Sequence, residues 1–253
     1  SRVLKEPRYA AAAVGAAEFV LNTLRTSEGL LLRTAKEGAG RLNAYLEDYA
    51  YLANALVSLY EATFDSRWIR RAEEIVATMV DQFWDEQEAG FFYTGKDHET
   101  LIVRGKDPHD NAVPSGNSMA VTALVRLAKL TGNSQYVDMV ERTLQRFRSI
   151  MASTPQVAAQ MLIALETHLG PTREFAIVGA PEAPETQPVV DTLFERYLPN
   201  KVVALKRENE PAGPIALLEG KTASDQGPSV YICTNFACQA PVVGADALRG
   251  ALG

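Results

Sequence analysis

One helical hairpin occurs twice in this sequence, and no other feature constrains the fold as strongly. Residues 55–69 align with residues 123–137, 68 positions further along. Each copy has an Ala-Leu-Val-x-Leu run at helical spacing, then a polar turn, Asp65-Ser66 or Asn133-Ser134, and then an aromatic residue that opens a second helix. Because repeated helix-turn-helix units stack on one another, the repeat predicts a solenoid or a closed ring of hairpins.

Two unpaired helices flank the repeated hairpins. Residues 9–24 resemble the second helix of such a unit without its first, and residues 155–169 resemble a first helix without its second. Each would expose an apolar face, at a cost on the order of 25 cal/mol per Å² of apolar area. We therefore expect the ring to be completed by a segment upstream of Ser1 or by another chain.

The segment between the hairpins, residues 85–118, is too long for an ordinary helix connection. Within it, residues 90–94 and 101–104 have the composition of short strands and flank a turn-rich stretch. They predict a β-hairpin folded over one end of the helices. A polar loop, residues 107–118, then leads into the next helix.

The pattern changes after Gly170-Pro171. Short β-type runs alternate with a helical stretch, which predicts a small α/β unit with parallel strands. The runs are residues 174–178, 201–206 and 230–234, and the helical stretch is 188–197. The fold class predicted is thus mainly α, a partial (α/α)6 toroid with a β-hairpin insertion over residues 1–170, followed by a small α/β domain over residues 171–253.

Composition excludes several functional classes. A hydrophobic share of 47% supports a packed core, and 25 Lys and Arg against 31 Asp and Glu give a net charge of −6. Without a basic stripe there is no electrostatic reason for nucleic acid to bind. The most apolar early stretch, residues 9–21, is shorter than the roughly 20 residues that cross a bilayer, and no export signal precedes it. We expect a cytoplasmic protein with no membrane partner, no metal site and no cofactor.

The two cysteines, Cys233 and Cys238, are too few for a disulfide framework and too sparse for zinc. A reducing compartment is the default reading. A thiol at the end of a strand can be reactive, so a redox role for this pair is one interpretation. Free cysteine is also among the most buried residue types, so an inert core role is the other.

Two polar segments are the candidate site. Rings of hairpins direct inner helix ends and connecting loops toward a central funnel, and both segments fall there. Carboxylates with a histidine suit proton transfer at a sugar, and aromatic rings supply flat faces for sugar rings. The catalytic candidates are Asp48, Asp110 and His109, and the substrate-binding candidates are Tyr45, Glu47, Tyr49, Asn111, Ser115 and Asn117.

The same residues have structural interpretations. Glu47 and Asp48 can simply complement a helix N-terminus. Asp, Asn and Ser in the second loop are the residues that turns and caps use, and a lone histidine such as His109 is more often a surface or structural residue. Both interpretations stay open on the sequence alone.

Three motifs resemble one known family. LEDYAYL at 46–52, DNAVPSGNS at 110–118 and CTNFACQAP at 233–241 occur in one order, and together they look like the C-terminal part of the thioredoxin-domain-containing, spermatogenesis-associated protein family. The resemblance implies a six-hairpin glycosidase-like toroid, related to N-acylglucosamine 2-epimerases, with about half of its ring helices in this chain. It also implies a thioredoxin-like domain with a C-x-x-C-type motif at the start of the full-length protein. No C-x-x-C motif occurs in this sequence, so that redox centre lies outside this chain or is absent.

Two functions from different classes are compatible with this resemblance. In the first, the toroid funnel binds a carbohydrate-like or other polar small molecule, and any catalysis is acid/base chemistry of the glycosidase or epimerase kind. In the second, the toroid is a non-catalytic scaffold that recruits a protein client for the thioredoxin domain. The expected partners are the upstream thioredoxin-like and N-terminal toroid segment of the same protein, or a completing chain.

Overall fold

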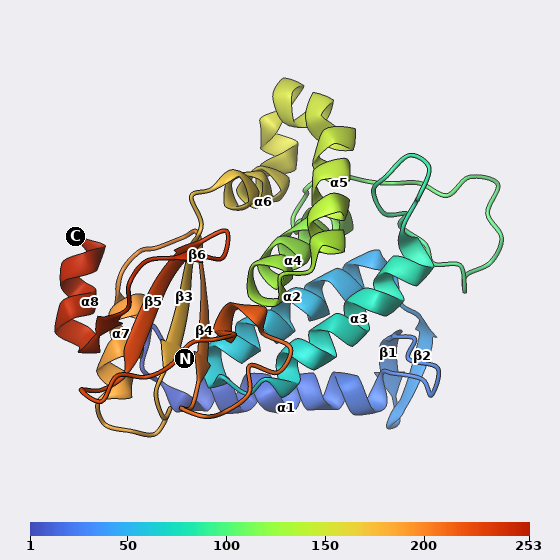
Figure 1. The fold of residues 1–253 in the computed structure, drawn as a ribbon. Coiled ribbons are helices and arrows are strands. Elements are labelled where there is room, and N and C mark those ends of the chain that lie inside the picture. Colours follow the sequence, from blue (N-terminus) through green and yellow to red (C-terminus); the bar gives the residue numbers. More distant parts are fainter.

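The computed structural model describes all 253 residues, and its first part is an arc of helices. Consecutive helices pair as antiparallel hairpins, so that α2, α4 and α6 form one row and α1, α3 and α5 pack against it (Figure 1). The helices are α1 (Pro7–Thr23), α2 (Leu46–Thr63), α3 (Arg67–Phe83), α4 (Gly116–Thr131), α5 (Ser134–Ser153) and α6 (Ala159–Leu169). No helix combines the length and hydropathy needed to cross a bilayer.

The repeat in the sequence is a repeat in the backbone. Phe64 caps the C-terminus of α2, and Gly132 caps that of α4, 68 positions later. Both residues adopt the left-handed conformation, with φ of 57° and 70°. The next side chain then caps the following helix: the Asp65 carboxylate accepts from the Arg67 backbone N–H, and the Asn133 amide oxygen accepts from that of Gln135, both at 3.0 Å. The same stop and start signals therefore build both hairpins.

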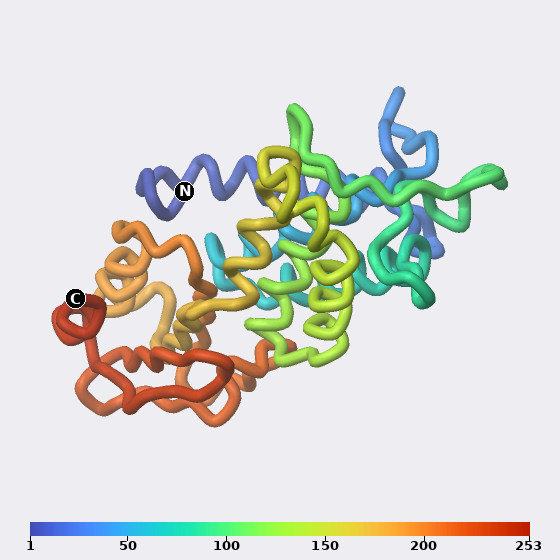
Figure 2. Tube along the Cα trace, turned by 90° about the horizontal axis from the view of Figure 1, so that it is seen from above, coloured from blue at the N-terminus to red at the C-terminus, as the bar shows by residue number.

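The β-hairpin insertion lies elsewhere than predicted. Strands β1 (Leu32–Lys36) and β2 (Ala39–Asn43) form it, in a segment for which the sequence had indicated no structure. The prediction of strands at 90–94 and 101–104 is wrong: these residues form turns and loops, with one isolated bridge between Trp84 and Phe91. The segment around residues 95–113 extends away from the helices (Figures 1 and 2).

A small mixed sheet follows the helices. Strand β3 (Arg173–Val178) pairs in parallel with β4 (Lys201–Lys206) through α7 (Thr186–Glu195), as predicted. The third predicted strand, β5 (Ser229–Thr234), pairs with β3 antiparallel instead. The sheet order is β4-β3-β5-β6, and β7 pairs with β5; the remaining elements are β6 (Ala237–Cys238), β7 (Val242–Val243), α8 (Gly244–Leu252), and the 3-10 turns η1 (Pro155–Ala158) and η2 (Ala216–Leu218).

Edge strand β4 faces the helices, and α2 satisfies its free backbone groups. The Glu61 carboxylate accepts from the Val203 backbone N–H at 3.1 Å, and the buried Tyr60 hydroxyl accepts from that of Leu205 at 3.2 Å. An exposed edge would offer these groups to another strand, so the two side chains block edge pairing. One cluster of 50 buried residues runs from the helices into the sheet. The domain boundary at residue 171 stays a prediction.

Candidate functional site

The N-terminal ends of α2, α4 and α6 meet around the polar loop of residues 107–118. A Cβ on Gly116, the first residue of α4, would lie 2.9 Å from the Leu46 side chain at the start of α2, so glycine permits this close approach. Asp110 ties the loop to α6, since its carboxylate accepts from the backbone N–H groups of Ser115 (2.8 Å) and Gln160 (2.7 Å). The polar segments that the sequence places at a funnel mouth thus do come together.

Two adjoining depressions open at this point. One has a volume of about 490 Å³ and the other of about 110 Å³. Both are lined by Tyr93, Asp107 and His109, while Glu47 and Asn111 line the smaller one. The larger lies within the usual size range of small-molecule sites, which are about 300–1,000 Å³. We refer to these two depressions together as the mouth site.

His109 and Asp107 form an exposed pair in the mouth site. The His109 Nδ1 atom lies 2.7 Å from the Asp107 Oδ1 atom, and that oxygen also accepts from the His109 backbone N–H at 2.9 Å. The side chains are 51% and 57% exposed, so they are free to contact a solute. When Nδ1–H donates to the carboxylate, the other ring nitrogen, Nε2, is left as a proton acceptor.

Glu47 and Asp48 share one cation from the β-hairpin. Arg33 on β1 lies 3.0 Å from the Glu47 carboxylate and 3.1 Å from that of Asp48. Asp48 also caps α2 by accepting from the Tyr45 backbone N–H at 2.8 Å. Partial burial raises the pKa of Asp48, although the Tyr45 hydrogen bond and Arg33 act in the opposite direction. Asp48 is thus engaged structurally, whereas Glu47 also faces the smaller depression.

Aromatic rings form one side of the mouth site. Tyr45 stacks on Tyr93 with ring centroids 4.8 Å apart, and the Arg33 guanidinium lies 4.9 Å from the Tyr45 centroid. The His98 ring also packs against Tyr45, with ring centroids 4.8 Å apart. This packing holds the Tyr93 ring at the wall shared by both depressions.

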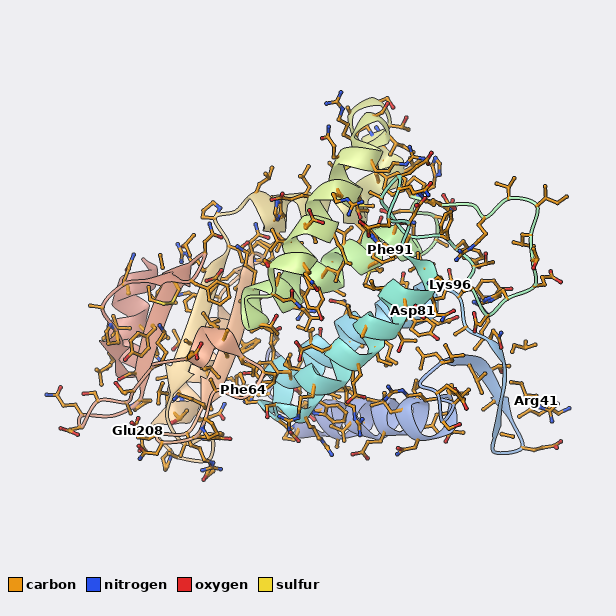
Figure 3. The ribbon with its side chains drawn as sticks, turned by 45° about the vertical axis from the view of Figure 1, so that its right-hand side comes forward. Arg41, Phe64, Asp81, Phe91, Lys96 and Glu208 are labelled. Atoms are coloured by element: carbon orange, nitrogen blue, oxygen red, sulfur yellow. A yellow bond between two sulfur atoms is a disulfide. The ribbon has the colours of Figure 1, made fainter.

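Several predicted site residues use their polar atoms inside the protein. Asn117 is 1% exposed, and its amide pairs with the Phe91 backbone, accepting from its N–H at 2.8 Å and donating to its carbonyl at 2.9 Å. The buried Tyr49 hydroxyl accepts from the Leu31 backbone N–H at 2.7 Å. Ser115 caps α4 by accepting from the Ser118 N–H. Figure 3 shows Phe91 beside the C-terminal end of α3, where Asp81 and Lys96 form a surface ion pair of 3.2 Å.

Three residues of the mouth site have no predicted role from the sequence. Asp107 lies in the predicted polar loop, but only its distance to His109 shows that the two form a pair. Tyr93 falls in a segment predicted as a strand, and Arg33 in a hairpin that was not predicted. No group of three or more His, Cys, Asp or Glu side chains is placed to hold a metal ion.

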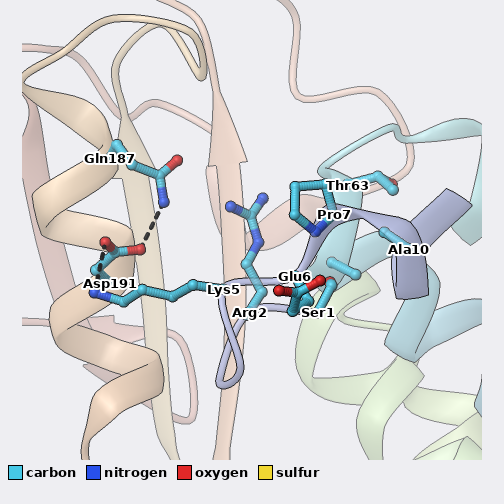
Figure 4. Close-up of a pocket in the computed structure, with 10 residues that line it drawn as sticks. Ser1, Arg2, Lys5, Glu6, Pro7, Ala10, Thr63, Gln187 and Asp191 are labelled. Carbon is cyan, nitrogen blue, oxygen red and sulfur yellow. Dashed lines mark hydrogen bonds and ion pairs between the residues drawn. The ribbon is translucent and has the colours of Figure 1, made fainter.

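Cys233 and Cys238 lie apart from the mouth site and are joined by a disulfide across β5 and β6. The reading of the pair as free thiols is therefore wrong, because the hairpin turn sets the two residues directly opposite each other. A further cavity, of about 470 Å³, lies between the N-terminal segment, the end of α2 and α7 (Figure 4). It holds none of the predicted site residues; Lys5 and Gln187 both contact Asp191 there.

Comparison with known proteins finds two mammalian relatives of the same name. It is 31% identical over 236 residues to spermatogenesis-associated protein 20 of Rattus norvegicus, covering 88% of this chain and 30% of the relative. It is 30% identical over 262 residues to the Homo sapiens protein of the same name, covering 98% of this chain and 33% of the relative. The chain is homologous to spermatogenesis-associated protein 20.

The homology extends along nearly all of this chain, but the chain spans only about a third of the length of these spermatogenesis-associated proteins. No family model matches. Among solved structures, cellobiose 2-epimerase from Spirochaeta thermophila aligns with a TM-score of 0.48 and 19% identity, over 58% of this chain and 39% of the epimerase.

Proposed function

We propose that the mouth site binds a carbohydrate-like or other polar small molecule. The observation that carries this proposal is the exposed His109–Asp107 pair, which lines both depressions together with the Tyr93 ring. A sugar ring can stack on Tyr93, while Glu47 and Asn111 offer hydrogen-bond partners to its hydroxyl groups.

If the site is catalytic, His109 is the group that moves the proton. Asp107 orients its ring, and Glu47 is the second carboxylate of an acid/base pair. Asp110, one of the residues assigned this role from sequence, is less suited to it because both its oxygens accept backbone hydrogen bonds. Of the three catalytic candidates predicted from the sequence, Asp48, Asp110 and His109, we therefore propose His109.

A thermal-shift screen with neutral sugars, sugar acids and polyols tests the proposal. We expect at least one class to stabilise the protein, and His109→Ala and Asp107→Asn to abolish that stabilisation while the melting temperature without ligand stays near that of the wild type. His168→Ala is the matched control, because His168 contacts Glu141 on α5, away from the mouth site. Equal ligand shifts in wild type and His109→Ala would refute the assignment.

A specific surface feature favours the second candidate, a scaffold that recruits a protein client. The loop beyond Tyr93 exposes three consecutive apolar residues, and Ile102 at its centre is 105% exposed. Leu101 and Val103 flank it at 41% and 77%. Exposed apolar patches commonly mark protein contacts. An Ile102→Asp variant that loses partner binding but retains ligand binding would favour the scaffold.

We also propose that other parts of the full-length protein cover the arc. Helix α1 has no buried residue, and Phe19 on it is 51% exposed. Ile163 on α6, at the other end of the arc, is 54% exposed. The relatives are about three times as long as this chain, so an N-terminal toroid segment, preceded by a thioredoxin-like domain, is the proposed occupant. The cytoplasmic location stays a proposal from composition.

A further inference from the structure

The disulfide closes a short hairpin that links the sheet to the helices. Cys233 on β5 and Cys238 on β6 are directly paired, and only four residues lie between them. Asn235 and Phe236 at the tip have φ of 49° and 63°. Two-residue turns of this geometry strongly prefer glycine at the second position, so phenylalanine there is held against its own backbone preference.

A buried carboxylate holds the tip from below. Glu174 on β3 is 0% exposed and accepts from the backbone N–H groups of Asn235 at 3.1 Å and Phe236 at 2.8 Å. Lys129 on α4 lies 3.5 Å from Glu174 and donates to the Asn235 side-chain oxygen at 2.6 Å. The turn is therefore attached both to the sheet and to the helices.

The Asn235–Phe236 turn forms one wall of a cavity that lies outside the mouth site. This cavity has a volume of about 390 Å³ and lies between the hairpin tip, α4, α5 and the end of α6. The Phe236 ring lies against the helix end, since a Cβ on Gly132 would be 3.5 Å from it. The opposite walls combine apolar residues, among them Val125, Val137 and Val140, with the polar side chains of Lys129, Glu141 and His168.

We propose that the Cys233–Cys238 disulfide is a dithiol-reducible crosslink that fixes the Asn235–Phe236 turn and so sets the width of this partly open cavity. The chemical partner is an external dithiol, and the two sulfur atoms differ in accessibility. Cys233 is 1% exposed, whereas Cys238 is only partly buried and lies at the outer strand of the sheet. The reductant therefore attacks at Cys238.

Reduction proceeds by two successive thiol–disulfide exchanges. A thiolate of the dithiol attacks the Cys238 sulfur, the bond between the two cysteines breaks, and Cys233 leaves as a thiolate that takes up a proton. The second thiolate of the dithiol then attacks the sulfur of the reductant in the mixed disulfide and releases Cys238, which is also protonated. The dithiol is oxidised to its cyclic disulfide, and the cysteine pair gains two electrons and two protons.

Reduction frees a six-residue loop, positions 233–238, from its crosslink. On the chain-entropy scale a loop of this length corresponds to about a 40-fold change in the opening equilibrium. The backbone preference of Phe236 acts in the same direction, so the tip opens while the central strands stay paired. The Phe236 ring then moves off the end of α4 and the cavity widens.

The test combines thiol labelling with hydrogen exchange on the native chain, using dithiothreitol as the dithiol. We expect both cysteines to become alkylated under native conditions after reduction. Exchange in the peptide covering residues 229–241 should accelerate by up to about 40-fold, and exchange over residues 125–141 should rise with it. The peptides of β3 and β4 serve as the internal control and should not change.

Variants separate the effect of the crosslink from general loosening. Cys233→Ala/Cys238→Ala should show the fast hairpin exchange without reductant and no further response to it. If this variant does not fold, reduced wild type still decides the question. The proposal is overturned if the disulfide resists dithiothreitol until denaturant is added, or if the hairpin exchanges as slowly after reduction as before it. Because neither readout involves the mouth site, failure here leaves the proposed function untouched.

Discussion

Replacing Asn117 with alanine should destabilise the protein rather than merely weaken ligand binding. The side chain is 1% exposed and makes three hydrogen bonds, two to the Phe91 backbone and one to the Asp107 carbonyl at 3.2 Å. Its removal leaves the backbone N–H of Phe91, itself 0% exposed, without a partner, which costs about 1–3 kcal/mol. The two carbonyls add to this, so we expect a loss of about 3 kcal/mol.

Urea unfolding followed by tryptophan fluorescence measures this loss. Trp84 is a local reporter, because its ring centroid lies 5.0 Å from that of Phe91. A loss of about 3 kcal/mol corresponds to a fall of roughly 6–12 °C in melting temperature for a chain of this size. Asn111→Ala is the control, since Asn111 is exposed in the same loop, and it should stay within about 0.5 kcal/mol. An Asn117→Ala variant as stable as wild type that no longer binds ligand would refute the structural reading.

Two further predictions concern buried tyrosines. Tyr60→Phe removes the acceptor of the Leu205 N–H and should cost about 1–3 kcal/mol in urea unfolding, with faster amide exchange in β4; unchanged exchange there would contradict the edge-capping role. Burial raises the pKa of Tyr49 to about 12, from about 10 in the unfolded chain, so the unfolded state ionises first and stability falls between pH 10 and pH 12. Two pKa units correspond to about 2.7 kcal/mol. About 2 kcal/mol of this falls between pH 10 and pH 12, so the loss of stability over this range should be smaller by about 2 kcal/mol in Tyr49→Phe. An unchanged pH profile would argue against the shift.

The helical arc could be predicted because its signals are local and occur twice. The apolar positions of α2 and α4 repeat with helical spacing, and the residues that end each hairpin's first helix and cap its second recur at the same offset. Each helix also has to bury one face, so periodicity and packing select the same residues. The same holds for β3 and β4, whose runs are short and almost fully buried, and for α7, which buries one face.

The β-hairpins could not be assigned in the same way. Strands β1 and β2 are largely exposed, so no alternating apolar pattern marks them. Residues 90–94 have the composition of a strand, but Phe91 is used as a core side chain whose backbone bonds to the Asn117 amide instead of a neighbouring strand. A side chain 26 positions away thus replaces the strand partner, and nothing in the local sequence indicates it.

The sequence also cannot show which aspartate of the candidate site is free to react. Asp107 and Asp110 belong to one polar loop and have identical chemistry, yet Asp110 accepts two backbone hydrogen bonds while Asp107 faces an exposed histidine. The difference arises because the Gln160 N–H at the start of α6 reaches one carboxylate and not the other. Both Asp110 oxygens are thus occupied by backbone donors. Only the placement of α6 therefore decides which acid of this loop is free for chemistry, and that placement depends on contacts between segments about 50 residues apart.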